Sequence, residues 1–177
     1  MPYNEMPKID VSKIYNGDVA EIPFDFELLP QDTESMDLVF PQPVRVVGRV
    51  YEKARGRDKA ESYVELAFEI TGRYETHCAR CAADLDREFH CERVYGLSRK
   101  LAADSDEYIE VPDGLLDIAE LARSVFYLEL PVKVLCREDC KGLCPVCGAN
   151  QNEKSCACKK NIGANTLEDL KKLLDKQ

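Results

Sequence analysis

The stretch CREDCKGLCPVCGANQNEKSCAC, residues 136–158, decides how this chain must be interpreted. The motif Cys144-Pro-Val-Cys147-Gly148 is its strongest piece, because a spacing of two residues lets both sulfurs reach one ion. The glycine allows a positive-φ turn that directs backbone amides at the thiolates. Four ligands are available locally, so the stretch predicts structural zinc in a small C-terminal module. The candidate ligands are six of the nine cysteines of the chain: Cys136, Cys140, Cys144, Cys147, Cys156 and Cys158.

Spacing alone leaves other interpretations of these cysteines open. Cys140-x3-Cys144-x2-Cys147 matches the cluster motif of radical enzymes that use S-adenosylmethionine, but the chain after it is too short for their barrel-like domain. An ordinary iron–sulfur cluster needs the same four-cysteine ligation. Disulfides fit poorly with an odd number of cysteines and with a reducing compartment. A thioredoxin-like pair would open a helix, whereas both CxxC motifs here lie in turn-rich sequence.

A second CxxC pair, Cys78 and Cys81, lies at the predicted tip of a β-hairpin. This pair either completes a zinc site with cysteines of the C-terminal module, or stays a reduced, exposed pair, or is a pair that oxidises to a disulfide only on isolation. Without Cys91, the remaining eight cysteines would fill two four-cysteine sites, so we expect one or two structural zinc ions. Cys91 follows the apolar alternation beside Phe89 and is predicted to be a buried thiol that packs like a small hydrophobic residue.

Composition describes an acidic, globular chain. Its 177 residues are 45% hydrophobic and 32% charged, with a net charge of −9, which suits one ordinary domain and a small appendage. The sequence has no run of transmembrane length and no apolar segment of the secretory kind near its start, so we expect a cytoplasmic protein without membrane contacts. Lysine and arginine residues are concentrated in two segments, one in the C-terminal region and one around residues 53–59. The candidate contacts to RNA or to a partner are Lys53, Arg55, Arg57 and Lys59.

The apolar pattern predicts an α+β fold. Alternation is clearest over residues 63–78 and 85–97, and further strands are expected at 9–11, 22–28 and 44–51. Asp117 is predicted to cap a helix that Pro131 ends, and residues 132–135 are predicted to form a strand leading to the first metal ligand. The buried stripe of the helix is predicted to be Ile118, Leu121, Ala122, Val125 and Leu128.

Two domains follow from this pattern. Residues 1–131 are predicted to form an antiparallel β-meander body with one packed helix. Residues 132–177 are predicted to form the cysteine-rich zinc module, which ends in a short terminal helix beginning at Asn165 or Thr166. We expect the body to fold without the module, because its strands and helix carry enough apolar positions for their own core.

No catalytic constellation is visible in the sequence. It contains no glycine-rich phosphate loop and no nucleophile elbow, and its two histidines, His77 and His90, are interpreted as surface or packing residues. A zinc ion with four cysteine ligands is coordinatively closed, with no position for a reactive water. We therefore expect a protein that is not an enzyme and has no small-molecule substrate.

Three blocks of sequence together resemble the YceD family, described as large ribosomal RNA subunit accumulation proteins. They are Cys78-Ala-Arg-Cys81 closing a hairpin, the helix from Asp117 running into Leu130-Pro131, and the segment CKGLCPVCGANQN with CAC behind it. The resemblance implies a factor that supports accumulation or biogenesis of the large ribosomal subunit and its 23S rRNA. The partner it implies is a large-subunit precursor, through rRNA, a ribosomal protein or both. Some members lack the C-terminal cysteines, which implies that the metal is scaffolding and that the function resides in the α+β body.

Two alternatives of other classes remain. One is a thiol redox sensor that uses Cys78 and Cys81, which would need a cysteine with a strongly lowered pKa. The other is a zinc-stabilised adaptor that binds only protein and would show no dependence on RNA.

Overall fold

The computed structural model describes residues 8–54, 62–99 and 108–158. The chain divides into two compact units. We call residues 1–76 and 84–132 the sheet unit, and residues 77–83 and 133–177 the cysteine unit. The predicted terminal helix lies outside the described residues. In chain order the elements are β1 (Lys8–Asp10), α1 (Ser12–Tyr15), β2 (Glu21–Leu28), the 3-10 helix η1 (Thr33–Met36), β3 (Val44–Ala54), β4 (Ser62–His77), β5 (Asp84–Ser98), β6 (Tyr108–Glu110), β7 (Leu115–Asp117) and α2 (Ile118–Leu128).

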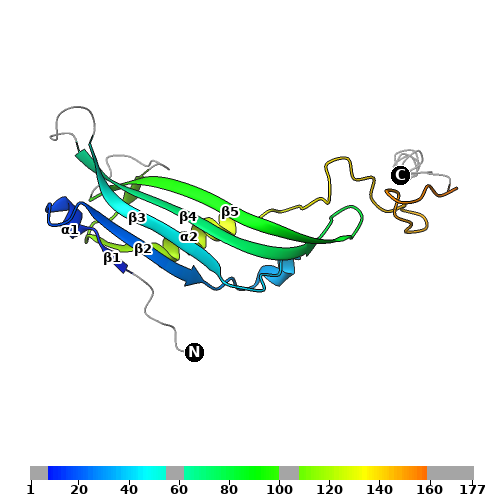
Figure 1. Cartoon of the computed structure of the whole chain (residues 1–177), viewed down its shortest axis with the longest axis horizontal. Coiled ribbons are helices and arrows are strands. Elements are labelled where there is room, and N and C mark those ends of the chain that lie inside the picture. Colours follow the sequence, from blue (N-terminus) through cyan, green and yellow to red (C-terminus); the bar gives the residue numbers. More distant parts are fainter. Residues whose placement is uncertain (1–7, 55–61, 100–107, 159–177) are drawn as a thin grey trace, which may run out of the picture. The chain divides into compact units, whose positions relative to one another are not determined.

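The sheet unit is built on a five-stranded sheet of order β2-β3-β4-β5-β6 (Figure 1). β2 pairs antiparallel with β3, which pairs antiparallel with β4. The strands predicted at 22–28, 44–51, 63–78 and 85–97 are therefore confirmed. β2 is an edge strand, and Pro23 lies near its start, where its missing N–H is tolerated. β6 was not predicted. It adds to β5 in the parallel sense, and its three residues give too short a pattern to recognise.

Alternation along β4 places one face of the strand in the core. Val64, Leu66, Phe68 and Ile70 are all buried, and the residues between them face the other side of the sheet. Side chains two apart in a strand share a face, so this run alone fixes which surface of β4 meets the core. The predicted alternation is confirmed.

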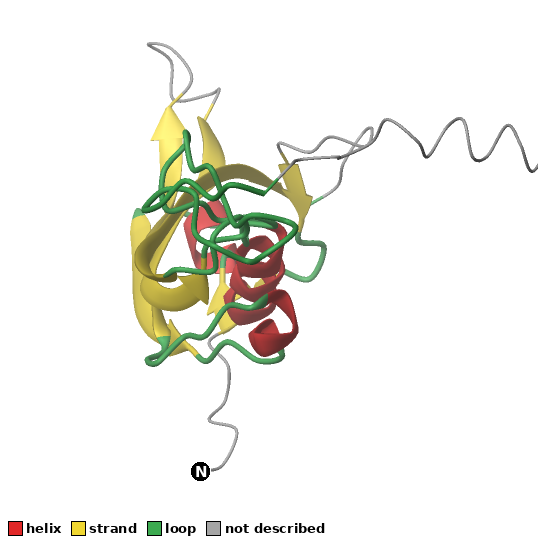
Figure 2. Cartoon of the chain, turned by 90° about the vertical axis from the view of Figure 1, so that its right-hand side faces the viewer, coloured by secondary structure: helices red, strands yellow, loops and turns green. Residues whose placement is uncertain are grey.

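The helix α2 packs against the sheet, which curves around it (Figure 2). The Asp117 side chain accepts a hydrogen bond from the Glu120 backbone N–H at 3.0 Å, so the predicted N-cap is confirmed. The predicted stripe was wrong at Leu128, which is 82% exposed, and Leu121 is only half-buried. The buried face also includes Ala119 and Phe126.

Aromatic rings fill the space between helix and sheet. The Phe126 ring lies 5.2 Å from the ring of Phe40 and 5.1 Å from that of Phe89, both in edge-to-face geometry. Cys91 is also buried, as predicted, and burial raises the pKa of its thiol. Among the described residues, no helix is long and apolar enough to cross a bilayer.

A second, two-stranded sheet pairs β1 with β7, so that Ile9 lies opposite Leu116. The Val11 N–H then donates to the Gly114 carbonyl at 2.8 Å. This pairing holds the N-terminal segment of the sheet unit beside the residues that lead into α2.

Candidate metal centre

The turn between β4 and β5 forms a knuckle that presents two thiols. Within residues 78–83, the Cys78 N–H donates to the Ala83 carbonyl and the Ala82 N–H donates to the Cys78 carbonyl, both at 2.8 Å. Ala82 takes a positive φ of 55°, which closes the turn. Cys78 and Cys81 are 2% and 7% exposed, so they are not the exposed pair that the sequence left open.

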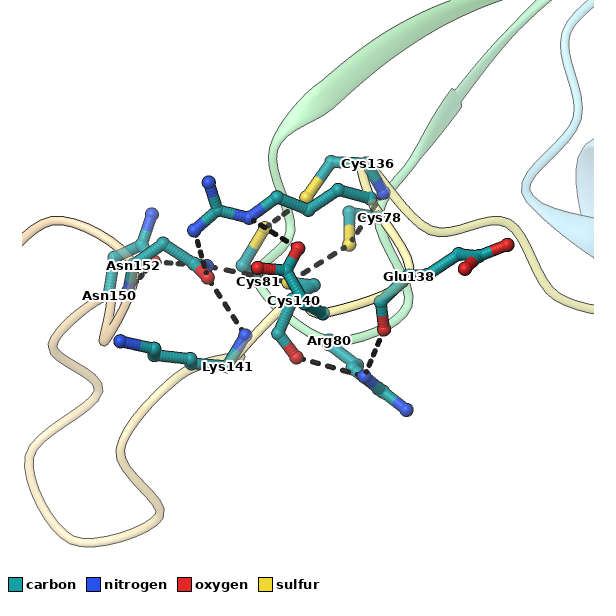
Figure 3. A network of polar contacts seen from close by, with 11 residues as sticks. Cys78, Arg80, Cys81, Cys136, Glu138, Cys140, Lys141, Asn150 and Asn152 are labelled. Atoms are coloured by element: carbon teal, nitrogen blue, oxygen red, sulfur yellow. Dashed lines mark hydrogen bonds and ion pairs between the residues drawn. The ribbon is translucent and has the colours of Figure 1, made fainter.

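Two cysteines from the C-terminal segment complete this site, and we call the four thiols the first tetrad (Figure 3). Their sulfurs lie within 4.8 Å of one another. Cys78 Sγ lies 3.8 Å from Cys140 Sγ, and Cys81 Sγ lies 3.7 Å from Cys136 Sγ. The members are Cys78, Cys81, Cys136 and Cys140.

The C-terminal segment reaches the knuckle through backbone hydrogen bonds. The predicted strand at 132–135 was wrong, because this run has no regular secondary structure and begins with a bend at Val132. It nevertheless bonds to the knuckle, since the Ala79 N–H donates to the Val134 carbonyl at 2.9 Å. Further along, the Arg80 guanidinium donates to the carbonyls of Glu138 and Cys140 at 3.1 and 2.9 Å (Figure 3).

The second tetrad is local in sequence and consists of Cys144, Cys147, Cys156 and Cys158. Gly148 has a φ of 72°, as expected for a glycine that closes a CxxC turn, and its N–H donates to the Cys144 carbonyl at 2.8 Å. Cys144 is buried at 2% exposed, whereas Cys147 is exposed. The four sulfurs again lie within 4.8 Å of one another.

The pKa values of the thiols within each tetrad are shifted in opposite directions. Burial is the largest influence on Cys78 and raises its pKa, but backbone amides pointing at the sulfur together lower that pKa to about 5. The hydrogen bond with Cys140, followed by burial, raises the pKa of Cys136 to about 12. In the second tetrad, backbone amides lower the pKa of Cys144 to about 6. Thiolates packed this closely repel one another, and a divalent cation removes that conflict.

The donor sets fit a tetrahedral metal ion. A zinc ion bound to four thiolates at about 2.3 Å spaces its sulfurs about 3.8 Å apart, close to the separations in the first tetrad. A disulfide needs an S–S distance of about 2.05 Å, and none of the nine cysteines, all of which lie in the described residues, forms one. Each tetrad can therefore hold one metal ion, and four protein ligands would leave no open coordination position.

The other predicted contact residues lie elsewhere. Arg55, Arg57 and Lys59 fall outside the described residues. Lys53 is at the end of β3, where its ammonium lies 2.7 Å from a carboxylate oxygen of Glu65. His90 is exposed and lies 3.2 Å from Glu92, and with Glu69 these two residues form a third cluster of possible metal ligands, all of them exposed. His77 is also exposed, so the surface interpretation of both histidines is confirmed.

Sequence reasoning missed a buried carboxylate on the outer face of β4. The Glu65 side chain is 7% exposed and accepts hydrogen bonds from the Tyr51 and Tyr63 hydroxyls as well as from Lys53. Burial is the largest influence and raises the pKa of Glu65, but these three donors outweigh it and hold the pKa below its usual value. A glutamate in alternating sequence resembles any solvent-facing residue, so nothing in the pattern singled it out.

Comparison with known proteins assigns a family. The profile described as "Large ribosomal RNA subunit accumulation protein YceD" matches residues 66–174. The chain is 38% identical over 73 residues to Large ribosomal RNA subunit accumulation protein YCED homolog 1, chloroplastic, of Zea mays, an alignment that covers 36% of this chain and 25% of the maize protein. The homologue with the same name in Arabidopsis thaliana is 32% identical over 65 residues, covering 35% of this chain and 20% of that protein.

The chain thus spans a quarter or less of the length of these curated relatives. No solved structure matches it. The family profile, however, covers more than half of the chain and includes α2 and both tetrads. On that match, the chain belongs to the YceD family of large ribosomal RNA subunit accumulation proteins.

Proposed function

We propose that this protein is a non-enzymatic factor that supports accumulation of the large ribosomal subunit and its rRNA, with a structural zinc ion in each tetrad. Family membership is the observation that carries the ribosomal role. The two four-cysteine sites carry the structural role of the metal, because a closed site binds no substrate. When bound, zinc supplies cross-links: the first tetrad ties the knuckle to the C-terminal segment, and the second closes the local loop.

Zinc is favoured over a redox role by the burial of the thiols. Cys78 has the lowered pKa that a redox cysteine needs. It is only 2% exposed, however, and a redox thiol must be reachable by its substrate. The same inward-pointing amides suit a thiolate that binds metal, so the lowered pKa is expected for a ligand as well.

The contact surface that we propose is the basic segment at residues 53–59, with Arg55, Arg57 and Lys59 as its candidate contacts. Lys53 is less available, because Glu65 already accepts from its ammonium. Four thiolates outweigh the charge of a zinc ion, so each filled tetrad is a net anion and repels phosphate. The basic segment is therefore preferred over the cysteine unit as the RNA-facing surface.

Co-sedimentation with large-subunit precursors tests the proposal. The variant Arg55→Gln/Arg57→Gln/Lys59→Gln should lose association and fail to restore rRNA accumulation in a deletion strain. Association of the unmodified chain should weaken steeply with salt, because phosphate contacts release counterions. Arg45→Gln/Arg73→Gln is the matched control, since these two exposed arginines are paired with Asp25 and Asp86.

The outcomes separate the alternatives. Unchanged association of the basic-segment variant would discard the proposed surface but not the ribosomal role. Co-sedimentation that survives ribonuclease would indicate an adaptor that binds only protein. Absence of zinc together with rapid alkylation of Cys78 and Cys81 would favour the redox sensor.

A further inference from the structure

The two tetrads are connected by a short ribbon, residues 140–152. Leu143 and Asn150 form an antiparallel bridge across it, and the Gln151 N–H donates to the Gly142 carbonyl at 2.9 Å. The Leu143 N–H also donates to the Arg80 carbonyl at 3.0 Å, which fastens the ribbon to the knuckle. Gly142 has a φ of 73°, and a Cβ there would lie 2.9 Å from the same carbonyl, so this close approach requires glycine.

One side chain of the ribbon contacts the first tetrad from within the loop of the second. Asn152 lies between Cys147 and Cys156 in sequence, yet its amide nitrogen donates to Cys140 Sγ at 3.4 Å (Figure 3). Its amide oxygen accepts from the Lys141 N–H at 2.8 Å and from the Arg137 guanidinium at 2.9 Å.

These contacts fix the orientation of the Asn152 amide. Two N–H groups point at Oδ1, so Nδ2 must face the Cys140 sulfur and the Asn150 Oδ1, 2.8 Å away. A donor aimed at a ligand sulfur stabilises its thiolate form and holds it in place. Asn152 therefore bonds to both the sulfur and the backbone of the segment that supplies Cys140.

We propose that Asn152 is a positioning residue that couples metal binding at the two tetrads. The ligands of the second tetrad span only residues 144–158, whereas those of the first span 78–140, so the second closes the smaller loop and loads first. Loading orders the loop that carries Asn152, which then holds Cys140 ready for the first tetrad. By reciprocity, metal in the first tetrad strengthens binding in the second by the same factor. This inference requires metal at both tetrads but not the ribosomal role.

Cobalt(II) titration of the full-length apoprotein, followed by thiolate charge-transfer absorption, tests the coupling. Disabling the second tetrad with Cys144→Ser/Cys147→Ser should weaken cobalt binding at the first tetrad about ten- to a hundredfold. Asn152→Ala should weaken the first tetrad to a similar extent with the second intact. Combining the changes should add little, because both remove the same interaction.

Two further variants make the result specific. Ser155→Ala, an exposed position in the same loop, should leave both affinities unchanged. Asn152→Asp keeps an acceptor for Lys141 but loses the donor to Cys140, so it should weaken the first tetrad at least as much as alanine.

Three results would overturn the proposal. The first is wild-type cobalt affinity at the first tetrad in Asn152→Ala or Asn152→Asp. The second is full additivity in the combined variant. The third comes from a chain whose first tetrad is disabled by Cys78→Ser/Cys136→Ser: if Asn152→Ala still weakened the second tetrad there, Asn152 would only fold its own loop.

Discussion

The sheet unit and the cysteine unit differ in the interactions that stabilise each of them internally. In the sheet unit, aliphatic and aromatic side chains from both sheets and from α2 are buried, with Phe126 fully enclosed. In the described part of the cysteine unit, the only buried residues are Gly142 and four cysteines: Cys78, Cys81, Cys140 and Cys144. A segment without an apolar core needs another source of stability, and the two tetrads could supply it by binding metal.

Metal removal should produce the largest difference in stability between the two units. Structural zinc contributes about 10–16 kcal/mol of apparent binding free energy in small zinc domains. Chelation, or Cys144→Ser, should therefore expose the cysteine unit to protease while the sheet unit keeps its cooperative melt. Metal analysis of the unmodified chain should return two zinc ions. A sheet unit that melts with the chelated cysteine unit would show that the contrast is false.

A substitution in the apolar core should destabilise the sheet unit and leave the cysteine unit unaffected. Phe126→Ala removes a fully buried ring that contacts Phe40 and Phe89, and should lower the free energy of unfolding of the sheet unit by about 3–5 kcal/mol. Denaturant titration measures this loss, and cobalt affinity at the tetrads should stay unchanged. Reduced cobalt affinity would mean that the tetrads depend on the core of the sheet unit.

A smaller effect is expected at the buried carboxylate of the sheet. Glu65→Gln leaves the Lys53 ammonium without its counter-ion and should destabilise the sheet unit by about 1–3 kcal/mol.

The pH dependence of that effect follows from linkage. The folded pKa of Glu65 lies below its unfolded value of about 4.3, so its contribution is present above that pH and is lost as the pH falls through the folded pKa. The stability difference between Glu65→Gln and the unmodified chain should therefore shrink on acidification below pH ~4. If this stability difference stayed constant on acidification, the ionised Glu65 carboxylate would not be what stabilises the sheet unit.

Exposed ion pairs should contribute least to the stability of the sheet unit. Arg45 and Asp25 lie 2.5 Å apart on neighbouring strands, yet both side chains are more than half exposed. Water and salt screen such pairs, so Arg45→Gln should leave the melting midpoint of the sheet unit within error. A clear drop in that midpoint would show that the outer face of the sheet contributes more to stability than its exposure suggests.

Periodicity and spacing in the sequence were sufficient wherever the signal was local. The alternation in β4 identified its core face, Asp117 identified the start of α2, and Gly148 marked the positive-φ turn after the CxxC motif. The family followed from the same cysteine and helix motifs. The division into an independent body at 1–131 and a module at 132–177 stays a prediction, and the structure groups the knuckle at 77–83 with the cysteine unit.

Only the tertiary structure decided which thiols meet. Cys144, Cys147, Cys156 and Cys158 are close in sequence, so chain connectivity alone keeps them near one another. The first tetrad draws its cysteines from segments far apart in the chain, and spacing cannot reveal whether a hairpin tip and a distant loop coincide. The same reason hid Glu65, which pairs with Tyr51 and Lys53 of the neighbouring strand, and Asn152, which contacts Cys140 of the first tetrad. Leu128 was misjudged because the apolar residues of this helix fit more than one stripe, and only the structure shows that Ala119 and Phe126 are buried while Leu128 is exposed.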